Sequence, residues 1–383
     1  MNKNVFFVSV IRTMNREATS TYIMTSSLLQ GIKQNGCNLV FFAICEHEDE
    51  MEEVKDYFSG VADSVIPLPS RIKPNIGTLG LLIHILAHTV SIGFYRKNIK
   101  KVYSSFCSVK PDLIISHSPS FESICYSRAM LDLVGNVPYF QYWSDPLALS
   151  GVCPENLGIK RKPYKWAENR ALYYGDRIIY GTKTLMQFQK VLFPKIADKM
   201  YYIDIPYVEG AKIENRSAIP KSLIYAGNYY SNIRNLHPLV RAVSEMPECS
   251  LDVYGNGDCP DPHINNICFH SRLSPKELEL LEERYECIVC VMNHSSIQIP
   301  GKIFYDIVKP IRILVIADGP YSRQITDYLA SYNRFVFCEN NVEDIKRAIR
   351  CSQDFRFNLE EMKNRYSNIR ITQFLINGGI SDA

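Results

Sequence analysis

Near residue 112 the chain runs Asp112-Leu113-Ile114-Ile115-Ser116-His117. The apolar centre of this run is too short for a helix and is typical of a strand that is buried on both faces of a parallel sheet. A helix is expected to begin almost at once, near Ser120. Strands that alternate with helices form parallel sheets, so this run predicts an α/β fold.

The same alternation extends in both directions along the chain. In the first half, further strands are expected at residues 5–10, 38–44, 64–68, 138–143 and 176–180. After a polar stretch the pattern restarts, with strands expected at residues 222–227, 251–255, 267–270, 287–292, 313–317 and 335–337. The clearest helices are expected at residues 20–35, 236–246, 301–309 and 342–349, and from the Ser274-Pro275-Lys276-Glu277 capping sequence onward.

This restart predicts two domains. We expect an N-terminal domain at 1–205, a linker at 206–220 and a C-terminal domain at 221–365, with a last segment, 366–383, that packs back on the first domain. The expected fold is two Rossmann-like parallel-sheet domains that face each other across a cleft. Open α/β sheets bind ligands at the carboxyl ends of their strands, so the loops after the strands are the places to search for a site.

The bulk composition excludes several classes of protein. The 383 residues include 43 basic and 40 acidic ones, for a net charge of +3, which is too balanced for a general nucleic-acid-binding protein. The 12 cysteines are scattered and are expected to be reduced and buried. Cys287 and Cys290 lie on one expected strand and point to opposite faces, so they are not expected to share a metal. Neither a signal peptide nor a membrane-spanning helix is expected, which favours the cytoplasm.

One apolar stretch has two interpretations. Residues 79–94 are mostly apolar, and Arg96, Lys97, Lys100 and Lys101 follow them. The stretch at 79–101 fits an amphipathic helix that lies on a membrane surface with a basic flank, and it equally fits a long helix that packs on the sheet. His84 and His88 are four residues apart, but they lack a third ligand and are not expected to bind a metal.

Two loops of the second domain carry candidate residues for an anion. Gly227 and Asn228 end one strand, and Arg234 follows closely; a glycine lets backbone amides approach an anion, and an arginine can bind a diphosphate with two hydrogen bonds. The loop at 294–302 runs from a strand into an expected helix, where Pro300 and Gly301 precede Lys302. Free amides at a helix start, together with a lysine, favour a diphosphate.

Two residues of the first domain are candidates for the opposite side of the cleft. His117 follows the strand at 112–116 and is placed to act on a hydroxyl group or a sugar, or to be a hydrogen-bonded loop histidine. Asp145 follows the strand at 138–143, where it could bind an acceptor hydroxyl or simply cap the next turn.

The order of these motifs resembles glycosyltransferase family four and its relatives over about residues 5–350. The runs that carry the resemblance are KPDLIISHSP, VPYFQYWSDP, AENRALYYGDRIIYGTKTLMQF, SLIYAGNYYSNIRNL, LDVYGNGD, FHSRLSPKELELLEERYECIVCVM and IPGKIFYDI. The last run looks like the Pro-Ser-Lys-Leu-Phe-Glu-Tyr motif of polysaccharide-building members. Two glutamates that the family usually has correspond here to Ile297 and Tyr305, with Asp306 next to the second.

The resemblance implies a GT-B fold and retaining transfer without a bound metal or other cofactor. It implies that Arg234 and Lys302 hold the donor diphosphate and that His117 lines the sugar pocket. The remaining residues that it implies at the donor are Gly227, Asn228, Ser271, Arg272, Pro300, Gly301, Tyr305 and Asp306. Ser271 and Arg272 would lie near the nucleobase, Asp306 near the ribose, and Asp145 on the acceptor side.

We therefore expect a glycosyltransferase that moves a hexose-type sugar from a nucleotide-diphosphate donor to a hydroxyl of a glycan or lipid-linked acceptor in surface polysaccharide synthesis. Its expected location is the cytoplasm, at the inner face of the membrane, and no nucleic acid is expected among its partners. Two alternatives remain: a non-catalytic GT-B module that binds a partner or a glycan, and a sugar-nucleotide epimerase.

Overall fold

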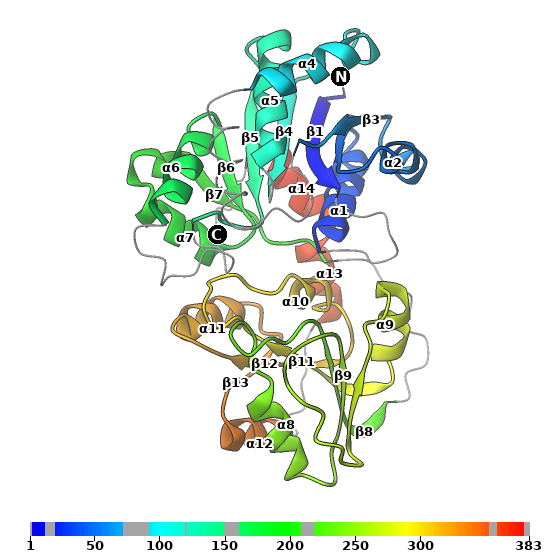
Figure 1. The fold of residues 1–383 in the computed structure, drawn as a ribbon, viewed down its shortest axis with the longest axis vertical. Helices are drawn as coiled ribbons and strands as arrows, with labels where there is room; N and C mark the ends of the chain where they lie inside the picture. Colours follow the sequence, from blue (N-terminus) through cyan, green and yellow to red (C-terminus); the bar gives the residue numbers. More distant parts are fainter. Residues whose placement is uncertain are drawn as a thin grey trace. The chain divides into compact units, whose positions relative to one another are not determined.

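A computed structural model describes residues 2–11, 20–71, 92–118, 121–148, 161–207, 218–351 and 358–378 (Figure 1). The chain divides into two compact units, Met1–Pro206 with Asn364–Ala383, and Tyr207–Lys363. The predicted linker lies largely outside the described residues, as do the loop at 12–19 and residues 79–91 of the apolar stretch. Each unit is described by itself below.

Unit 1 contains a parallel sheet, with seven strands in the described residues, in the order β3-β2-β1-β4-β5-β6-β7. The strands are β1 (Asn4–Ile11), β2 (Asn38–Cys45), β3 (Ser64–Pro69), β4 (Leu113–Ser118), β5 (Tyr139–Trp143), β6 (Arg177–Tyr180) and β7 (Met200–Tyr202). The first half of the chain was predicted to form such a sheet, and β7 is a strand that the apolar pattern did not predict. β1 and β4 are almost wholly buried, as expected of central parallel strands.

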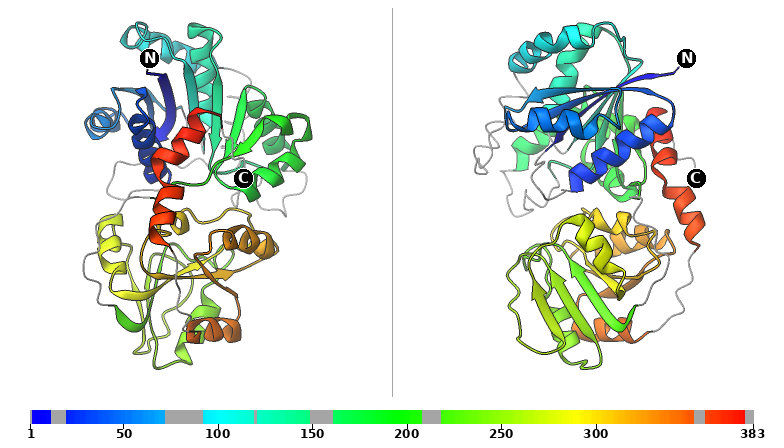
Figure 2. Two further views of the ribbon diagram at one scale, coloured as in Figure 1. Left: turned by 180° about the vertical axis from the view of Figure 1, so that it is seen from behind. Right: turned by 90° about the vertical axis from the view of Figure 1, so that its right-hand side faces the viewer.

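Helices cover this sheet. They are α1 (Ser20–Gln34), α2 (Glu50–Phe58), α4 (Gly93–Val102), α5 (Phe121–Val134), α6 (Arg161–Leu172) and α7 (Lys183–Leu192), with short 3₁₀ turns at Tyr103–Ser105 and Pro194–Lys199. α13 (Leu359–Tyr366) and α14 (Asn368–Ile376) end the described chain. α14 lies beside α1, as both views of Figure 2 show, and Asn35 Nδ2 donates to the Ile369 carbonyl at 2.8 Å and to Thr372 Oγ1 at 2.9 Å.

Unit 2 contains a second parallel sheet, with six strands in the described residues, in the order β10-β9-β8-β11-β12-β13. The strands are β8 (Ile219–Ala226), β9 (Ser250–Tyr254), β10 (Ile267–His270), β11 (Tyr285–Val291), β12 (Arg312–Ala317) and β13 (Val336–Glu339). The helices are α8 (His237–Ser244), α9 (Pro275–Glu282), α10 (Lys302–Tyr305), α11 (Ser322–Ala330) and α12 (Val342–Arg350). Leu239, Val243 and Ile345 of α8 and α12 pack in one core with alternate residues of the strands.

Two local predictions in unit 2 have opposite outcomes. The capping sequence is confirmed, because Ser274 and Glu277 form a reciprocal capping box at the start of α9. The helix predicted at 301–309 is wrong in length, because α10 ends at Tyr305. The side chains of Asp306 and Lys309 point into an ion-pair cluster beyond that end, which is described below.

The fold class is thus two tandem parallel-sheet α/β domains, as predicted. In the described residues, no helix is both long enough and apolar enough to cross a membrane. Of the apolar stretch, the described part is residues 92–101, most of it in α4. Tyr95 and Ile99 of α4 pack into the core of unit 1, while Lys97, Lys100 and Lys101 are exposed.

Candidate functional site

The loops that leave β8, β9 and β10 are held together by backbone hydrogen bonds. Gly227 N donates to the Tyr254 carbonyl at 2.9 Å, and Gly255 N donates to the His270 carbonyl at 3.2 Å. Gly255 has a φ of +145°, and a Cβ atom there would lie 2.1 Å from the Gly227 carbonyl oxygen. Only a glycine fits this approach, so the Gly255 turn fixes how the two loops pack.

Arg234 lies over the first of these loops. Its Nη1 atom is 3.6 Å from where a Cβ atom on Gly227 would stand. Its Nε donates to Asn293 Oδ1 at 2.8 Å, and Asn293 Nδ2 in turn donates to the Gln298 carbonyl at 2.9 Å. Asn293 follows β11, so the amide orients the guanidinium from a neighbouring strand end. Sequence reasoning missed Asn293, because a single asparagine after a strand has no distinctive spacing.

Arg234 has no carboxylate partner in the described part of the chain. Its side chain also hydrogen-bonds the Tyr225 hydroxyl, which donates to the Asn228 carbonyl at 3.0 Å. Burial raises the pKa of Tyr225 to about 12, and Arg234 counteracts part of that shift. Arg234 is half-buried. A partly desolvated guanidinium without a counter-ion is suited to bind an anion.

Lys302, unlike Arg234, is paired with carboxylates. Its ammonium group pairs with Glu282, and it lies 2.6 Å from Asp306 Oδ2. Lys309 completes the cluster, at 2.5 Å from Glu282 Oε2 and 2.6 Å from Asp306 Oδ1. Two lysines therefore neutralise two carboxylates that are almost fully buried.

The pKa shifts in this cluster reflect the pairing. Burial alone would lower the pKa of Lys302, but the carboxylates of Asp306 and Glu282 raise it. Burial would raise the pKa of Asp306, but Lys302 and Lys309 lower it. Sequence reasoning named Lys302 and Asp306 and missed Glu282, which comes from α9. The spacing of Asp306, four residues after Lys302 and three before Lys309, was the signal that could have found the pairing.

The other candidates of unit 2 lie at loops and at the start of α10. Asn228, Ser271 and Arg272 are exposed, the last two directly after β10. Pro300 and Gly301 are half-buried before α10, and Tyr305 is buried at its end. Both oxygens of Asp306 accept from lysines, so its carboxylate is engaged inside the unit. The donor roles predicted for these residues stay predictions.

In unit 1 the prediction that His117 follows its strand is wrong, because β4 continues to Ser118 and His117 pairs in register with Ser9 of β1 and Tyr142 of β5. Its side chain is fully buried. Nδ1 lies 3.0 Å from Thr25 Oγ1 and 3.3 Å from Ser9 Oγ. Burial lowers the pKa of His117 to about 3, so the ring is neutral at physiological pH.

Nε2 of His117 is buried and has no hydrogen-bond partner among the described residues. Phe7 and Tyr142 flank the ring on its two sides, with ring centroids 6.3 and 5.3 Å away. Residues 12–19, which follow β1 in the sequence, lie outside the described residues. A role for His117 beside a sugar stays a prediction.

Three buried glutamates hold the loops after strands of unit 1. Glu50 accepts from the amides of Glu46 and His47 at 2.9 and 3.1 Å, after β2. Glu122 accepts from Ser70 Oγ at 2.5 Å and from the Arg71 amide at 2.7 Å, after β3.

The third glutamate, Glu168, holds the loop after β5. It accepts from the amides of Leu147 and Ala148 at 3.3 and 2.7 Å, and from Gln189 Nε2 at 3.1 Å. Asp145 is half-buried in the same loop, where Ser144 Oγ donates to its Oδ2 at 3.4 Å. Glu168 thereby fixes the loop that carries the acceptor-side candidate.

Comparison with solved structures finds proteins that superpose on almost the whole chain. The N-terminal domain of Candida albicans trehalose-6-phosphate phosphatase superposes with a TM-score of 0.62 at 9% identity, covering 98% of this chain and 96% of that one. The glycotransferase of kitacinnamycin superposes with a TM-score of 0.58 at 11% identity, covering 99% of each chain. UDP-GlcNAc 2-epimerase from Neisseria meningitidis, solved bound to UDP-GlcNAc, gives 0.56 at 11% identity, covering 98% of this chain and 99% of that one.

No protein-family model matches the sequence, and the comparison with curated proteins finds no match. At these identities the structural likeness shows the fold alone. The two parallel-sheet domains of this chain are those of the GT-B fold, in agreement with the sequence prediction.

Proposed function

We propose that the chain is a glycosyltransferase that moves a sugar from a nucleotide-diphosphate donor to a hydroxyl of a glycan or lipid-linked acceptor. The observation that carries the proposal is Arg234, a half-buried guanidinium without a carboxylate partner in the described residues, oriented by Asn293 above the glycine loop after β8. Its place at the carboxyl end of a parallel sheet is where such sheets bind nucleotides.

In this proposal Arg234 binds the donor diphosphate and stabilises the negative charge that grows on it as the sugar departs. The proposed reaction is retaining, as the family resemblance implies, and it would need no metal, because Arg234 would neutralise the charge on the leaving diphosphate. Lys302 contributes less than its sequence motif implies, because two carboxylates neutralise it. Its part is to fix the α10 region that follows the Asn293 loop.

The wider setting is also part of the proposal. A role in surface polysaccharide synthesis at the inner face of the cell membrane is supported by the family resemblance and by the exposed Lys97, Lys100 and Lys101 of α4. A basic surface of this kind attracts anionic lipids. Replacing these three lysines with glutamine should abolish binding to anionic vesicles, and unchanged binding would remove the membrane from the proposal.

The test of the transferase itself is donor cleavage. The full chain is incubated with a panel of sugar nucleotides, and released nucleoside diphosphate is measured. We expect slow release from one donor, and at least about a tenfold slower release with Arg234→Gln, because a hydrogen bond to a charged group contributes about 1.5–3 kcal/mol. Arg241→Gln is the matched control, since Arg241 is 75% exposed on α8.

The outcomes separate the three functions. Release of diphosphate that depends on Arg234 supports the transferase. An epimerised sugar nucleotide as the product would show an epimerase instead. Tight nucleotide binding with no turnover of any donor would show a non-catalytic binding module, and either of the last two results overturns the proposal.

A further inference from the structure

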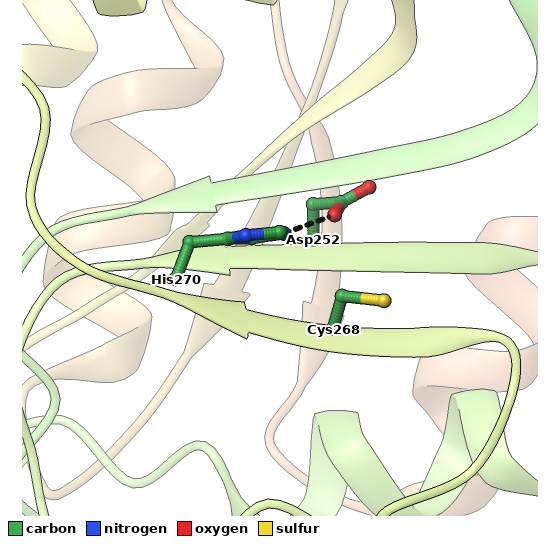
Figure 3. Close-up of side chains that lie close together, drawn as sticks. All are labelled: Asp252, Cys268 and His270. Carbon is green, nitrogen blue, oxygen red and sulfur yellow. Dashed lines mark hydrogen bonds and ion pairs between the residues drawn. The ribbon is translucent and has the colours of Figure 1, made fainter.

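Three side chains with metal-binding chemistry meet on one face of the sheet in unit 2. β9 and β10 pair in parallel, with Asp252 opposite Cys268 and Tyr254 opposite His270. Because side chains alternate along a strand, Cys268 and His270 lie on the same face, and Asp252 shares it across the pair. Figure 3 shows the three residues on the two adjacent strands.

The donor atoms of these residues already lie close to one another. Asp252 Oδ, Cys268 Sγ and a ring nitrogen of His270 are all within 4.8 Å of one another. His270 Nε2 lies 2.5 Å from Asp252 Oδ1. Zinc bonds of about 2.0–2.3 Å in a tetrahedral site place neighbouring ligand atoms about 3.5 Å apart. Small side-chain rotations would therefore convert the group into three ligands of one ion.

The surroundings hold two of the three ligands in place. The ring of Tyr254 stacks on that of His270, with centroids 4.4 Å apart and planes 13° from parallel. A side-chain hydrogen bond joins the Tyr285 hydroxyl to Asp252. A hydroxyl that donates to a ligating carboxylate orients it, as outer-shell partners of metal sites commonly do.

The Cys268 thiol adds a third potential metal ligand to the Asp252–His270 pair. Cys268 is an exposed, free cysteine. Cys107 and Cys351 are also exposed, but among the described residues only Cys268 lies in a group of three converging ligands. Thiolate, imidazole and carboxylate together favour zinc over magnesium or calcium, which prefer oxygen ligands.

We propose that Asp252, Cys268 and His270 bind one zinc-like divalent cation, with a fourth coordination position open to solvent. Binding removes the proton of the Cys268 thiol and releases it to solvent, while the imidazole binds in its neutral form. The ion joins the middle of β9 to β10, whose last residue, His270, directly precedes the Ser271–Arg272 loop. It is separate from the proposed transfer reaction, which uses Arg234 and no metal.

Cobalt(II) titration tests this site, because a cobalt–thiolate bond produces a charge-transfer absorption band that zinc then abolishes by displacement. The protein is the full chain without an affinity tag, reduced and treated with chelator. We expect one equivalent of cobalt to produce the band. Cys268→Ser should remove the band, and Asp252→Asn should weaken cobalt binding at least about tenfold. Cys107→Ser, the matched exposed cysteine, should change neither.

The proposal is overturned if no thiolate band forms, or if the band keeps its full strength in Cys268→Ser. Circular dichroism of each variant checks that the fold is intact. Arg234→Gln should bind cobalt normally, so a failed metal site and a failed transferase give different results.

Discussion

The charged side chains near the carboxyl ends of the strands differ between the two units. In unit 1, buried glutamates accept hydrogen bonds from the loops that follow β2, β3 and β5, and His117 is held neutral. In unit 2, glycine turns and backbone bonds join the loops, and Arg234 remains without a carboxylate partner among the described residues. In unit 1 the buried glutamates therefore stabilise loops, whereas in unit 2 Arg234 has no carboxylate partner among the described residues and can bind an anionic ligand.

Unit 2 repeats this contrast on a smaller scale. Lys302 and Arg234 are both cations near strand ends, and sequence motifs assign both to the donor diphosphate. The structure pairs Lys302 with Glu282 and Asp306, while Arg234 is held by the neutral amide of Asn293. Charge alone does not mark a ligand-binding residue, because its partners decide whether the charge is available.

The largest expected effect concerns the stability contributed by Lys302. Lys302→Met leaves Glu282 and Asp306 with Lys309 alone, so the free energy of unfolding of unit 2 should fall by about 3–5 kcal/mol. Urea denaturation measures it, with Lys276→Met on α9 as the exposed control. A loss of unfolding free energy below about 1 kcal/mol would show that the ion pairs of Lys302 with Glu282 and Asp306 are weak and that Lys302 is available for a ligand.

The next effect concerns the loop after β5. Glu168→Gln removes a carboxylate that accepts two amides and Gln189, and it should cost about 2 kcal/mol of unfolding free energy. Glu53→Gln, an exposed glutamate on α2, is the control and should change stability by less than about 0.5 kcal/mol. Equal stabilities of the two variants would contradict the structural role of the buried glutamates.

His117 gives unit 1 a dependence on pH. Its pKa is about 3 when folded and about 6.5 in the unfolded chain, so the unfolded state binds more protons below pH 6.5 and stability falls as the pH falls. Between pH 6.5 and about pH 5 the loss should be about 2 kcal/mol. His117→Gln should flatten this dependence, whereas His47→Gln, at an exposed position, should leave it unchanged. A slope that His117→Gln does not alter would show that His117 titrates normally.

The sequence predicted the positions of most strands along the chain, because a parallel strand that is buried on both faces is a short apolar run. It missed β7, whose three residues Met200, Tyr201 and Tyr202 carry too little pattern to be recognised. It placed His117 in a loop, since the polar pair Ser116-His117 resembles a strand end. Ser9 and Thr25 hydrogen-bond the ring of His117, and the Tyr139 hydroxyl hydrogen-bonds Ser116, all from distant parts of the chain.

The candidate site was harder to predict than the fold, because its interacting residues are far apart in the sequence. Glu282 is 20 residues from Lys302, and Asn293 is 59 residues from Arg234. A local sequence pattern cannot predict such pairs, because their residues become neighbours only when the sheet forms. Asp252, Cys268 and His270 were also missed, because their grouping depends on the register between β9 and β10.

The most direct test of the account is whether Arg234 recognises a diphosphate. Calorimetry compares nucleoside diphosphates with the matching monophosphates for the unmodified chain, Arg234→Gln and Arg241→Gln. The account predicts that the unmodified chain and Arg241→Gln prefer the diphosphate by about tenfold or more, and that Arg234→Gln loses most of this preference while keeping its melting temperature. A diphosphate preference that survives undiminished in Arg234→Gln would contradict it.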